Sequence, residues 1–141
     1  MNRVRELTSV LGLVILVSLW WGCAPRTQTA TSAPTAQARP RSTATVAILS
    51  PAPGAVITGT TLHVKLGLAG GELVPLTSTH LTPDTGHVHL ILDGKVVSMV
   101  SGLDQDVPVT KGPHILQAEF VAVDHFPFNP RVISVATFTA Q

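Results

Sequence analysis

The segment His87-Val88-His89-Leu90-Ile91-Leu92-Asp93-Gly94-Lys95-Val96-Val97-Ser98-Met99-Val100 decides the fold. It consists of two runs rich in Val, Ile and Leu that are joined by Asp93-Gly94. An Asp-Gly pair between two apolar runs is the strongest short-range signal for a two-residue β-hairpin. The segment therefore predicts two antiparallel strands, over 87–92 and 95–100.

Further strand patterns flank this hairpin on both sides. Between residues 62 and 68, Leu and Val alternate with polar residues or Gly, so one face of that strand is expected to be buried. The other expected strands cover 46–49, 55–58, 73–76, 115–123 and 132–139. About seven short strands without an amphipathic helix predict an all-β, immunoglobulin-like β-sandwich, and a small β-barrel is the alternative.

The composition and the charge of the chain argue against nucleic-acid binding. The chain is 45% hydrophobic and only 12% charged, whereas ordinary soluble domains have about 25% charged residues. Residues 46–141 carry four basic and seven acidic side chains, a net charge of −3 that the total of +1 conceals. Nucleic-acid binding needs a Lys/Arg footprint, and the four basic residues here are scattered. We therefore expect no nucleic-acid partner.

The N-terminal segment has the pattern of a targeting signal. Arg3 and Arg5 precede an apolar run over 10–21, which is too short to span about 30 Å of hydrocarbon comfortably. The run ends at Gly22-Cys23, and Cys23 is the single cysteine of the chain. This arrangement resembles a bacterial lipoprotein signal, in which a small residue precedes a cysteine that is acylated. The resemblance implies lipidation at Cys23 and anchoring to a membrane of the bacterial cell envelope on its extracytoplasmic side; the alternative is a plain membrane anchor with an incidental cysteine.

The following stretch, 24–45, has the composition of a tether. It contains only Ala, Pro, Arg, Thr, Gln and Ser, so it cannot bury enough apolar surface to offset the entropy of ordering. The predicted organisation is a signal peptide over 1–22, a lipidated cysteine with a disordered tether over 23–45, and a β-sandwich domain over 46–141.

The histidines are the residues with the most evident chemistry. His87 and His89 lie two apart on a predicted strand, so both side chains project from one face with Cα atoms about 6.5 Å apart. At that spacing two imidazoles can converge on one copper or zinc ion. We expect His125, which follows Asp124 in a loop, to be the third ligand. His114 begins the strand that His125 follows, so a straight strand would hold the two up to about 35 Å apart and only one of them can join His87 and His89. His114 is the less favoured candidate, because the loop with Asp124 and His125 can fold over the end of a neighbouring strand.

Other interpretations of the same residues remain. A histidine beside a turn often hydrogen-bonds backbone groups, and such a structural role without metal fits His63, His80 and His114. No serine lies in a Gly-x-Ser-x-Gly context, and no general base with an orienting partner can be named, so we expect no enzymatic activity. A blue-copper site needs a cysteine thiolate, and Cys23 lies outside the predicted domain.

Four short motifs together resemble one family. The motifs are Gly86-His87-Val88-His89-Leu90, Gly112-Pro113-His114-Ile115-Leu116, Asp124-His125-Phe126-Pro127 and Val132-Ile133-Ser134-Val135. Their order is similar to that of small His-rich bacterial extracytoplasmic immunoglobulin-like domains of unassigned function. The resemblance implies a β-sandwich with a shared histidine cluster and no particular reaction. The chain is accordingly interpreted as a membrane-anchored, non-enzymatic binding or accessory module for copper, zinc or an envelope protein; a purely structural or protein-interaction sandwich without metal is the alternative.

Overall fold

The computed structural model describes residues 38–100 and 102–141. These residues form strands, turns and bends, and no helix. The strands are β1 (Thr45–Ser50), β2 (Ala55–Ile57), β3 (Thr61–Ala69), β4 (Glu72–Leu73), β5 (Thr85–Leu92), β6 (Lys95–Ser98), β7 (Asp104–Pro108), β8 (Gly112–Ala122) and β9 (Pro127–Ala140). The predicted all-β class is confirmed.

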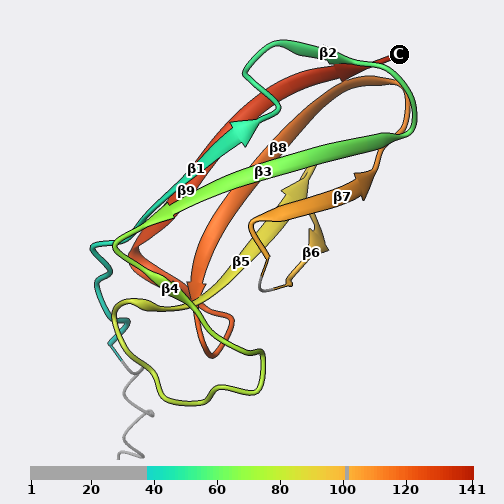
Figure 1. Cartoon of the computed structure of the whole chain (residues 1–141). Helices are drawn as coiled ribbons and strands as arrows, with labels where there is room; N and C mark the ends of the chain where they lie inside the picture. Colours follow the sequence, from blue (N-terminus) through green and yellow to red (C-terminus); the bar gives the residue numbers. More distant parts are fainter. Residues whose placement is uncertain (1–37, 101) are drawn as a thin grey trace, which may run out of the picture. The chain divides into compact units, whose positions relative to one another are not determined.

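The strands form two sheets. One sheet has the order β1-β3-β7, and the other has the order β2-β9-β8-β5-β4 with β6 paired to β5. In Figure 1, β3 crosses in front of β8, which places the two sheets as separate layers. Neighbouring strands are antiparallel except for β2 beside β9 and β4 beside β5. Two layers that do not share strands make a sandwich, so the barrel alternative is wrong.

Alternate residues of both sheets build the core between the layers. Leu62, Val64 and Leu66 of β3 are almost fully buried, which confirms the period of two seen between residues 62 and 68. The second sheet contributes Val88, Leu90, Leu116 and Phe120. Each fully buried Val, Leu or Phe stabilises the fold by about 1.5 to 3 kcal/mol through loss of apolar surface from water.

The strand β7 was not expected from the sequence. Its residues Asp104-Gln105-Asp106-Val107-Pro108 include two aspartates and a proline, which are rare in strands. Pairing with β3 places Gln105 and Val107 inward and leaves both aspartates exposed. Long-range pairing therefore overrides local preference in this segment.

The domain begins earlier than predicted. Ala44 is buried in the core, and the carbonyl of Pro40 accepts a hydrogen bond of 3.0 Å from the backbone N–H of Asn129. The prediction that the disordered tether extends to residue 45 is therefore wrong for residues 38–45. The reason is that hydrogen bonds from this segment, which its composition does not show, attach it to the sandwich.

The remaining N-terminal predictions fall outside the described residues. These are the signal peptide over 1–22, the lipidated Cys23 and the tether up to residue 37. Within 38–100 and 102–141, the chain contains no helix of the length and apolarity needed to cross a membrane.

Candidate functional site

His87 and His89 project from the outer face of β5. Val88 and Leu90, which alternate with them, are fully buried in the core on the opposite face. The predicted placement of both histidines on one strand face is confirmed. An outer sheet face normally meets solvent, yet His87 is 0% exposed and His89 only 8%.

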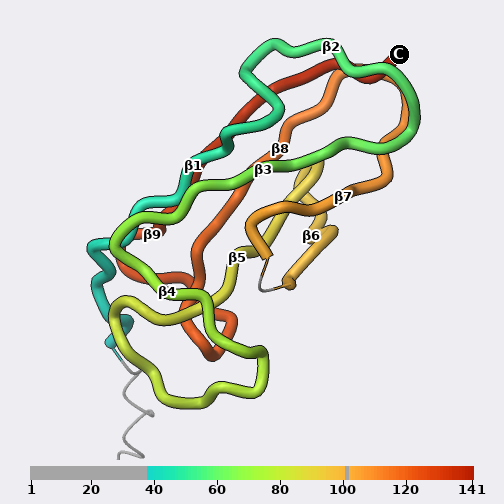
Figure 2. The backbone as a smooth tube through the Cα atoms, viewed as in Figure 1, coloured from blue at the N-terminus to red at the C-terminus, as the bar shows by residue number. Residues whose placement is uncertain are grey.

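The turn between β8 and β9 brings His125 to these two histidines. In Figure 2 this turn lies at the end of the sheet where β5 begins, in agreement with the pairing of Gly86 with Ala122. The ring of His125 stacks against His87 with 4.7 Å between ring centroids, and against His89 with 5.4 Å. Nε2 of His89 and Nδ1 of His125 are 3.2 Å apart and share a hydrogen bond. We call His87, His89 and His125 the histidine cluster.

His125 has an unusual backbone conformation. Its φ angle is +62°, a left-handed value that is uncommon for residues other than glycine. The turn is closed by two backbone hydrogen bonds, from the N–H of His125 to the carbonyl of Ala122 and from the N–H of Ala122 to the carbonyl of Phe126. Such backbone conformations persist where surrounding structure enforces them, and they gather at functional sites.

His87 lacks the partners that a buried histidine usually has. Neither of its ring nitrogens makes a well-formed hydrogen bond within residues 38–100 and 102–141, although the backbone of Val74 and of Val123 lies near enough to affect its pKa. The large majority of buried side-chain polar atoms in known proteins are hydrogen-bonded. A buried imidazole without a well-formed hydrogen bond is therefore an exception that requires an explanation.

The surroundings of His87 and His89 favour their neutral imidazole forms. Burial lowers the pKa of His87 and of His89, and the nearby charge of protonated His125 lowers both further. The backbone carbonyls of Val74 and Val123 oppose this shift in the pKa of His87, and Glu119 opposes it for His89. Neutral imidazoles keep a nitrogen lone pair free, which is the form that binds metal ions.

Glu119 is a buried charge beside the cluster that sequence reasoning missed. It lies on β8 directly opposite His89 and is almost fully buried. Arg131 of β9 holds its carboxylate by two contacts, Nε to Oε1 at 2.6 Å and Nη2 to Oε2 at 2.5 Å. Opposite charges on the two strands that flank the His125 turn were the signal that could have indicated this pair.

The cluster as it stands does not enclose an ion. No three His, Cys, Asp or Glu side chains in the described part of the chain are arranged to hold a metal ion. The rings of the histidine cluster are stacked on one another, and only His89 and His125 direct nitrogens toward each other.

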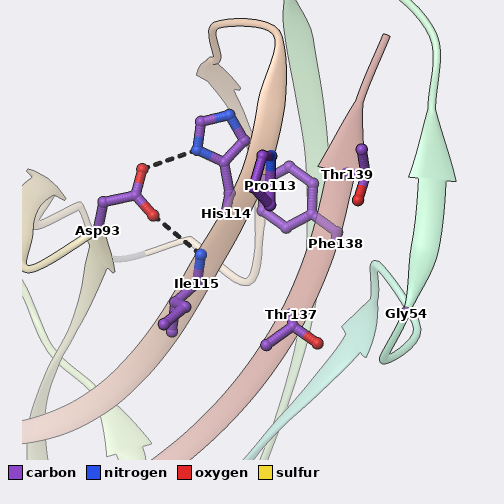
Figure 3. A pocket seen from close by; sticks show the side chains of 8 residues that line it. All are labelled: Gly54, Asp93, Pro113, His114, Ile115, Thr137, Phe138 and Thr139. Carbon is purple, nitrogen blue, oxygen red and sulfur yellow. Dashed lines mark hydrogen bonds and ion pairs between the residues drawn. The ribbon is translucent and has the colours of Figure 1, made fainter.

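His114 lies in a different environment, which Figure 3 shows. Its Nδ1 donates to Oδ2 of Asp93 at 2.7 Å and its Nε2 donates to the carbonyl of Thr110 at 2.7 Å. These bonds raise the pKa of His114, with the Asp93 bond as the largest cause. Asp93 also accepts from the backbone N–H of Ile115, so the Asp93-Gly94 turn is tied to β8.

A hollow of about 480 Å³ lies beside His114, lined also by Phe138 and Thr137. Because both nitrogens of His114 are already hydrogen-bonded, His114 offers no free nitrogen to this hollow. The other two histidines are exposed; His63 contacts Asp106 at 2.8 Å on the outer face of the first sheet.

The comparisons with known proteins bear on the fold of the chain. No family model matches the chain, and no curated protein matches it. The chain is similar to the fibronectin(III)-like modules of Clostridium thermocellum CbhA, with a TM-score of 0.50 and 13% identity, over 70% of this chain and 46% of that one. It is also similar to an engineered protein, with a TM-score of 0.43 and 16% identity, over 70% of this chain and 20% of that one. This chain thus spans less than half the length of either. The likeness to the fibronectin(III)-like modules confirms the immunoglobulin-like β-sandwich.

Proposed function

We propose that the chain is a lipid-anchored, extracytoplasmic, non-enzymatic module of the bacterial cell envelope that binds a Cu(II) or Zn(II) ion through His87, His89 and His125. The observation that supports this proposal most is His87, which is fully buried and makes no well-formed hydrogen bond with either ring nitrogen, although the backbone of Val74 and of Val123 lies near enough to raise its pKa. His114 is buried to a similar degree and uses both nitrogens in hydrogen bonds. A purely structural role would favour the second arrangement, and a binding role explains the first.

The spacing of the other two histidines suits one ion. Two nitrogens bound to zinc at about 2.0 to 2.1 Å, with an angle near 100 to 110°, lie about 3.1 to 3.4 Å apart. The nitrogens of His89 and His125 are 3.2 Å apart. Binding by all three requires His87 to turn one nitrogen toward this pair. The net charge of −3 on residues 46–141 favours a cation nearby.

Two further parts of the proposal have other support: the lipid anchor rests on the sequence, and the non-enzymatic role rests on the surroundings of His114. Gly22-Cys23 after an apolar run supports lipid anchoring in the envelope. The ring nitrogens of His114 bond the Asp93 carboxylate and the Thr110 carbonyl and no hydroxyl or thiol, so the Asp93–His114 pair supports a structural role.

Metal titration of the full chain in mild detergent tests the proposal. We expect calorimetry with CuCl₂ or ZnCl₂ to give one ion per chain, and we expect the double variant His87→Ala/His89→Ala to give none. The control is His63→Ala/His80→Ala, which removes two exposed histidines and leaves binding unchanged. Binding should weaken as pH falls below about 6.5 and through the lowered pKa values of His87 and His89, because protons then compete for the imidazoles. Equal heats for the parent and the His87/His89 variant would contradict the proposal.

A second candidate function is protein interaction. Val96, Val97, Met99 and Val100 are each 41 to 52% exposed, on β6 and just after it. Figure 1 shows β6 at the edge of its sheet beside β5. Exposed apolar patches on soluble proteins often mark interaction sites. Absence of metal binding in the parent would favour this candidate.

A further inference from the structure

Arg39 holds the turn that carries His125. Its guanidinium donates four hydrogen bonds, all to residues 124–127: Nη1 to Oδ2 of Asp124 at 2.5 Å, Nη2 to Oδ1 of Asp124 at 2.9 Å, Nη2 to the carbonyl of Phe126 at 3.0 Å, and Nε to the carbonyl of Pro127 at 2.9 Å. The same group also lies over the ring of Phe126, 5.6 Å from its centroid. One side chain therefore contacts three of these four residues, on both sides of His125.

These contacts fix geometry more than they add stability. A two-pronged guanidinium–carboxylate pair is directional, and the two carbonyl acceptors restrict the turn further. His125 needs such restriction, since its φ of +62° is unfavourable for a side chain with Cβ. The ring of His125 covers His87 only while the turn keeps this conformation.

The segment that carries Arg39 precedes β1. We call residues 38–43 the strap. Besides Arg39, the strap is attached through the carbonyl of Pro40, which accepts from the N–H of Asn129, and through Thr43, whose hydroxyl is 3.4 Å from Oδ1 of Asp84. The strap therefore contacts the loop before β5 and the start of β9. These two segments flank the histidine cluster in the sequence.

We infer that Arg39 is a positioning residue for the histidine cluster: the docked strap holds His125 over His87 and His89 and so completes the ion site. The ion in this inference rests on the proposed function. The position of His125 rests on the structure alone. Because coupling between two binding events is reciprocal, an ion bound by the cluster strengthens docking of the strap by the same factor. Ion loading is thereby linked to the part of the chain that leads toward Cys23.

The experiment compares Arg39→Ala with Arg41→Ala in the full chain in mild detergent. Arg41 is exposed and lies two residues away in the same strap, so it controls for loss of one positive charge. The first measurement needs no metal: diethyl pyrocarbonate labelling of each histidine, quantified by mass spectrometry. We expect His87 in the parent to react much more slowly than exposed His80, and in Arg39→Ala to react at a rate near that of His80.

The second measurement is the Zn(II) dissociation constant. Loss of groups that orient metal ligands commonly weakens binding by about 10- to 100-fold, and we expect that range for Arg39→Ala. Arg39→Lys keeps the charge without the two-pronged contact and should give an intermediate value, whereas Arg41→Ala should match the parent. The urea midpoint of each variant shows whether the sandwich stays folded. If Arg39→Ala does not fold, the variant Asp124→Asn is used for both measurements instead. It removes the same ion pair by changing the carboxylate partner.

The outcomes separate the inference from the proposed function. Parental labelling of His87 together with parental zinc affinity in Arg39→Ala overturns the inference and leaves the metal site standing. Faster labelling of His87 in Arg39→Ala, with no ion bound by the parent, supports the positioning role and overturns metal binding. Faster labelling together with weaker zinc binding supports both.

Discussion

At the scale of single residues, two buried histidines in one small domain have opposite surroundings. His114 donates from both ring nitrogens, to Asp93 and to Thr110, whereas His87 makes no well-formed hydrogen bond with either nitrogen. An unsatisfied buried polar group costs about 1 to 3 kcal/mol of stability. The fold therefore retains His87 at a cost in stability, which is the usual relation between a binding site and the scaffold that carries it.

Replacing His87 by leucine measures that cost directly. We expect His87→Leu, without metal, to leave the free energy of unfolding unchanged or to raise it by about 1 kcal/mol, because leucine fills the space without a polar atom. His114→Leu should lower it by about 2 kcal/mol, because it removes two hydrogen bonds, one of them to a carboxylate. Urea unfolding in the presence of a chelator compares the two variants. Equal destabilisation by both would make His87 a structural residue.

The Asp93–His114 pair predicts a definite pH dependence. The pKa of His114 is raised, so the stability from its ionised form is fully present below the unfolded value of about 6.5 and is lost as pH rises through the folded pKa. The pKa of Asp93 is lowered, chiefly by the N–H of Ile115, so its contribution is present above about 3.9 and is lost at lower pH. The contribution of the pair is therefore largest between about pH 4 and 6.5.

The variant His114→Gln tests this window. The difference in unfolding free energy between the parent and His114→Gln should shrink as pH rises above about 6.5. The lowered pKa values of His87 and His89 act in the opposite direction, destabilising the fold below about 6.5, but they are common to both proteins and cancel in the difference. A difference that stays constant from pH 5 to 9 would show that His114 is not ionised by Asp93.

At the scale of elements, the site depends on how closely β5 and β8 approach at one point. Gly86, immediately before His87, pairs with Ala122. A Cβ atom placed on Gly86 would lie 1.9 Å from the carbonyl oxygen of Val121, a backbone atom that cannot move without separating the strands. Glycine at this position thus permits the close pairing that places His87 under the His125 turn.

Alanine substitutions at two glycines test this requirement. Gly86→Ala should destabilise the fold by about 3 kcal/mol or more, since overpacking against backbone is poorly relieved. The matched control is Gly67→Ala on β3, where the new Cβ would meet Cδ1 of Leu49 at 3.5 Å, an ordinary contact. That variant should change stability by less than about 1 kcal/mol, in the stabilising direction. Urea midpoints decide the matter, and equal effects at the two sites would contradict the close approach.

At the scale of the whole molecule, local patterns predicted the layers and only part of the site. Alternating apolar residues and the Asp93-Gly94 turn were sufficient for the sandwich and for its strands other than β7, because burial of one sheet face has a period of two. The spacing of His87 and His89 placed them correctly for the same reason. Their burial could not be predicted, because it depends on the β8–β9 turn folding back over β5.

The contribution of Arg39 was missed for a related reason. It lies in a stretch whose composition is that of a disordered tether, and its partners Asp124 and Phe126 are more than eighty residues away in the sequence. Composition reports how much apolar surface a segment can bury, whereas four directional hydrogen bonds from one guanidinium do not register in it. Pairing across the whole chain, which only the folded structure shows, determines where the domain begins.

The lipid anchor is the prediction that concerns the whole molecule. Serine has no thiol to carry a thioether-linked lipid, so Cys23→Ser should either keep its signal peptide or appear in the soluble fraction, as seen by membrane fractionation and intact mass. Thr27→Ser, an equally small change nearby in the sequence, should fractionate and be processed like the parent. Zinc affinity should be the same in all three proteins, because the strap that positions His125 begins beyond both substitutions. A Cys23→Ser protein with the parental mass and the parental membrane fraction would contradict acylation. In that case the apolar segment over 10–21 alone would have to hold the chain at the membrane.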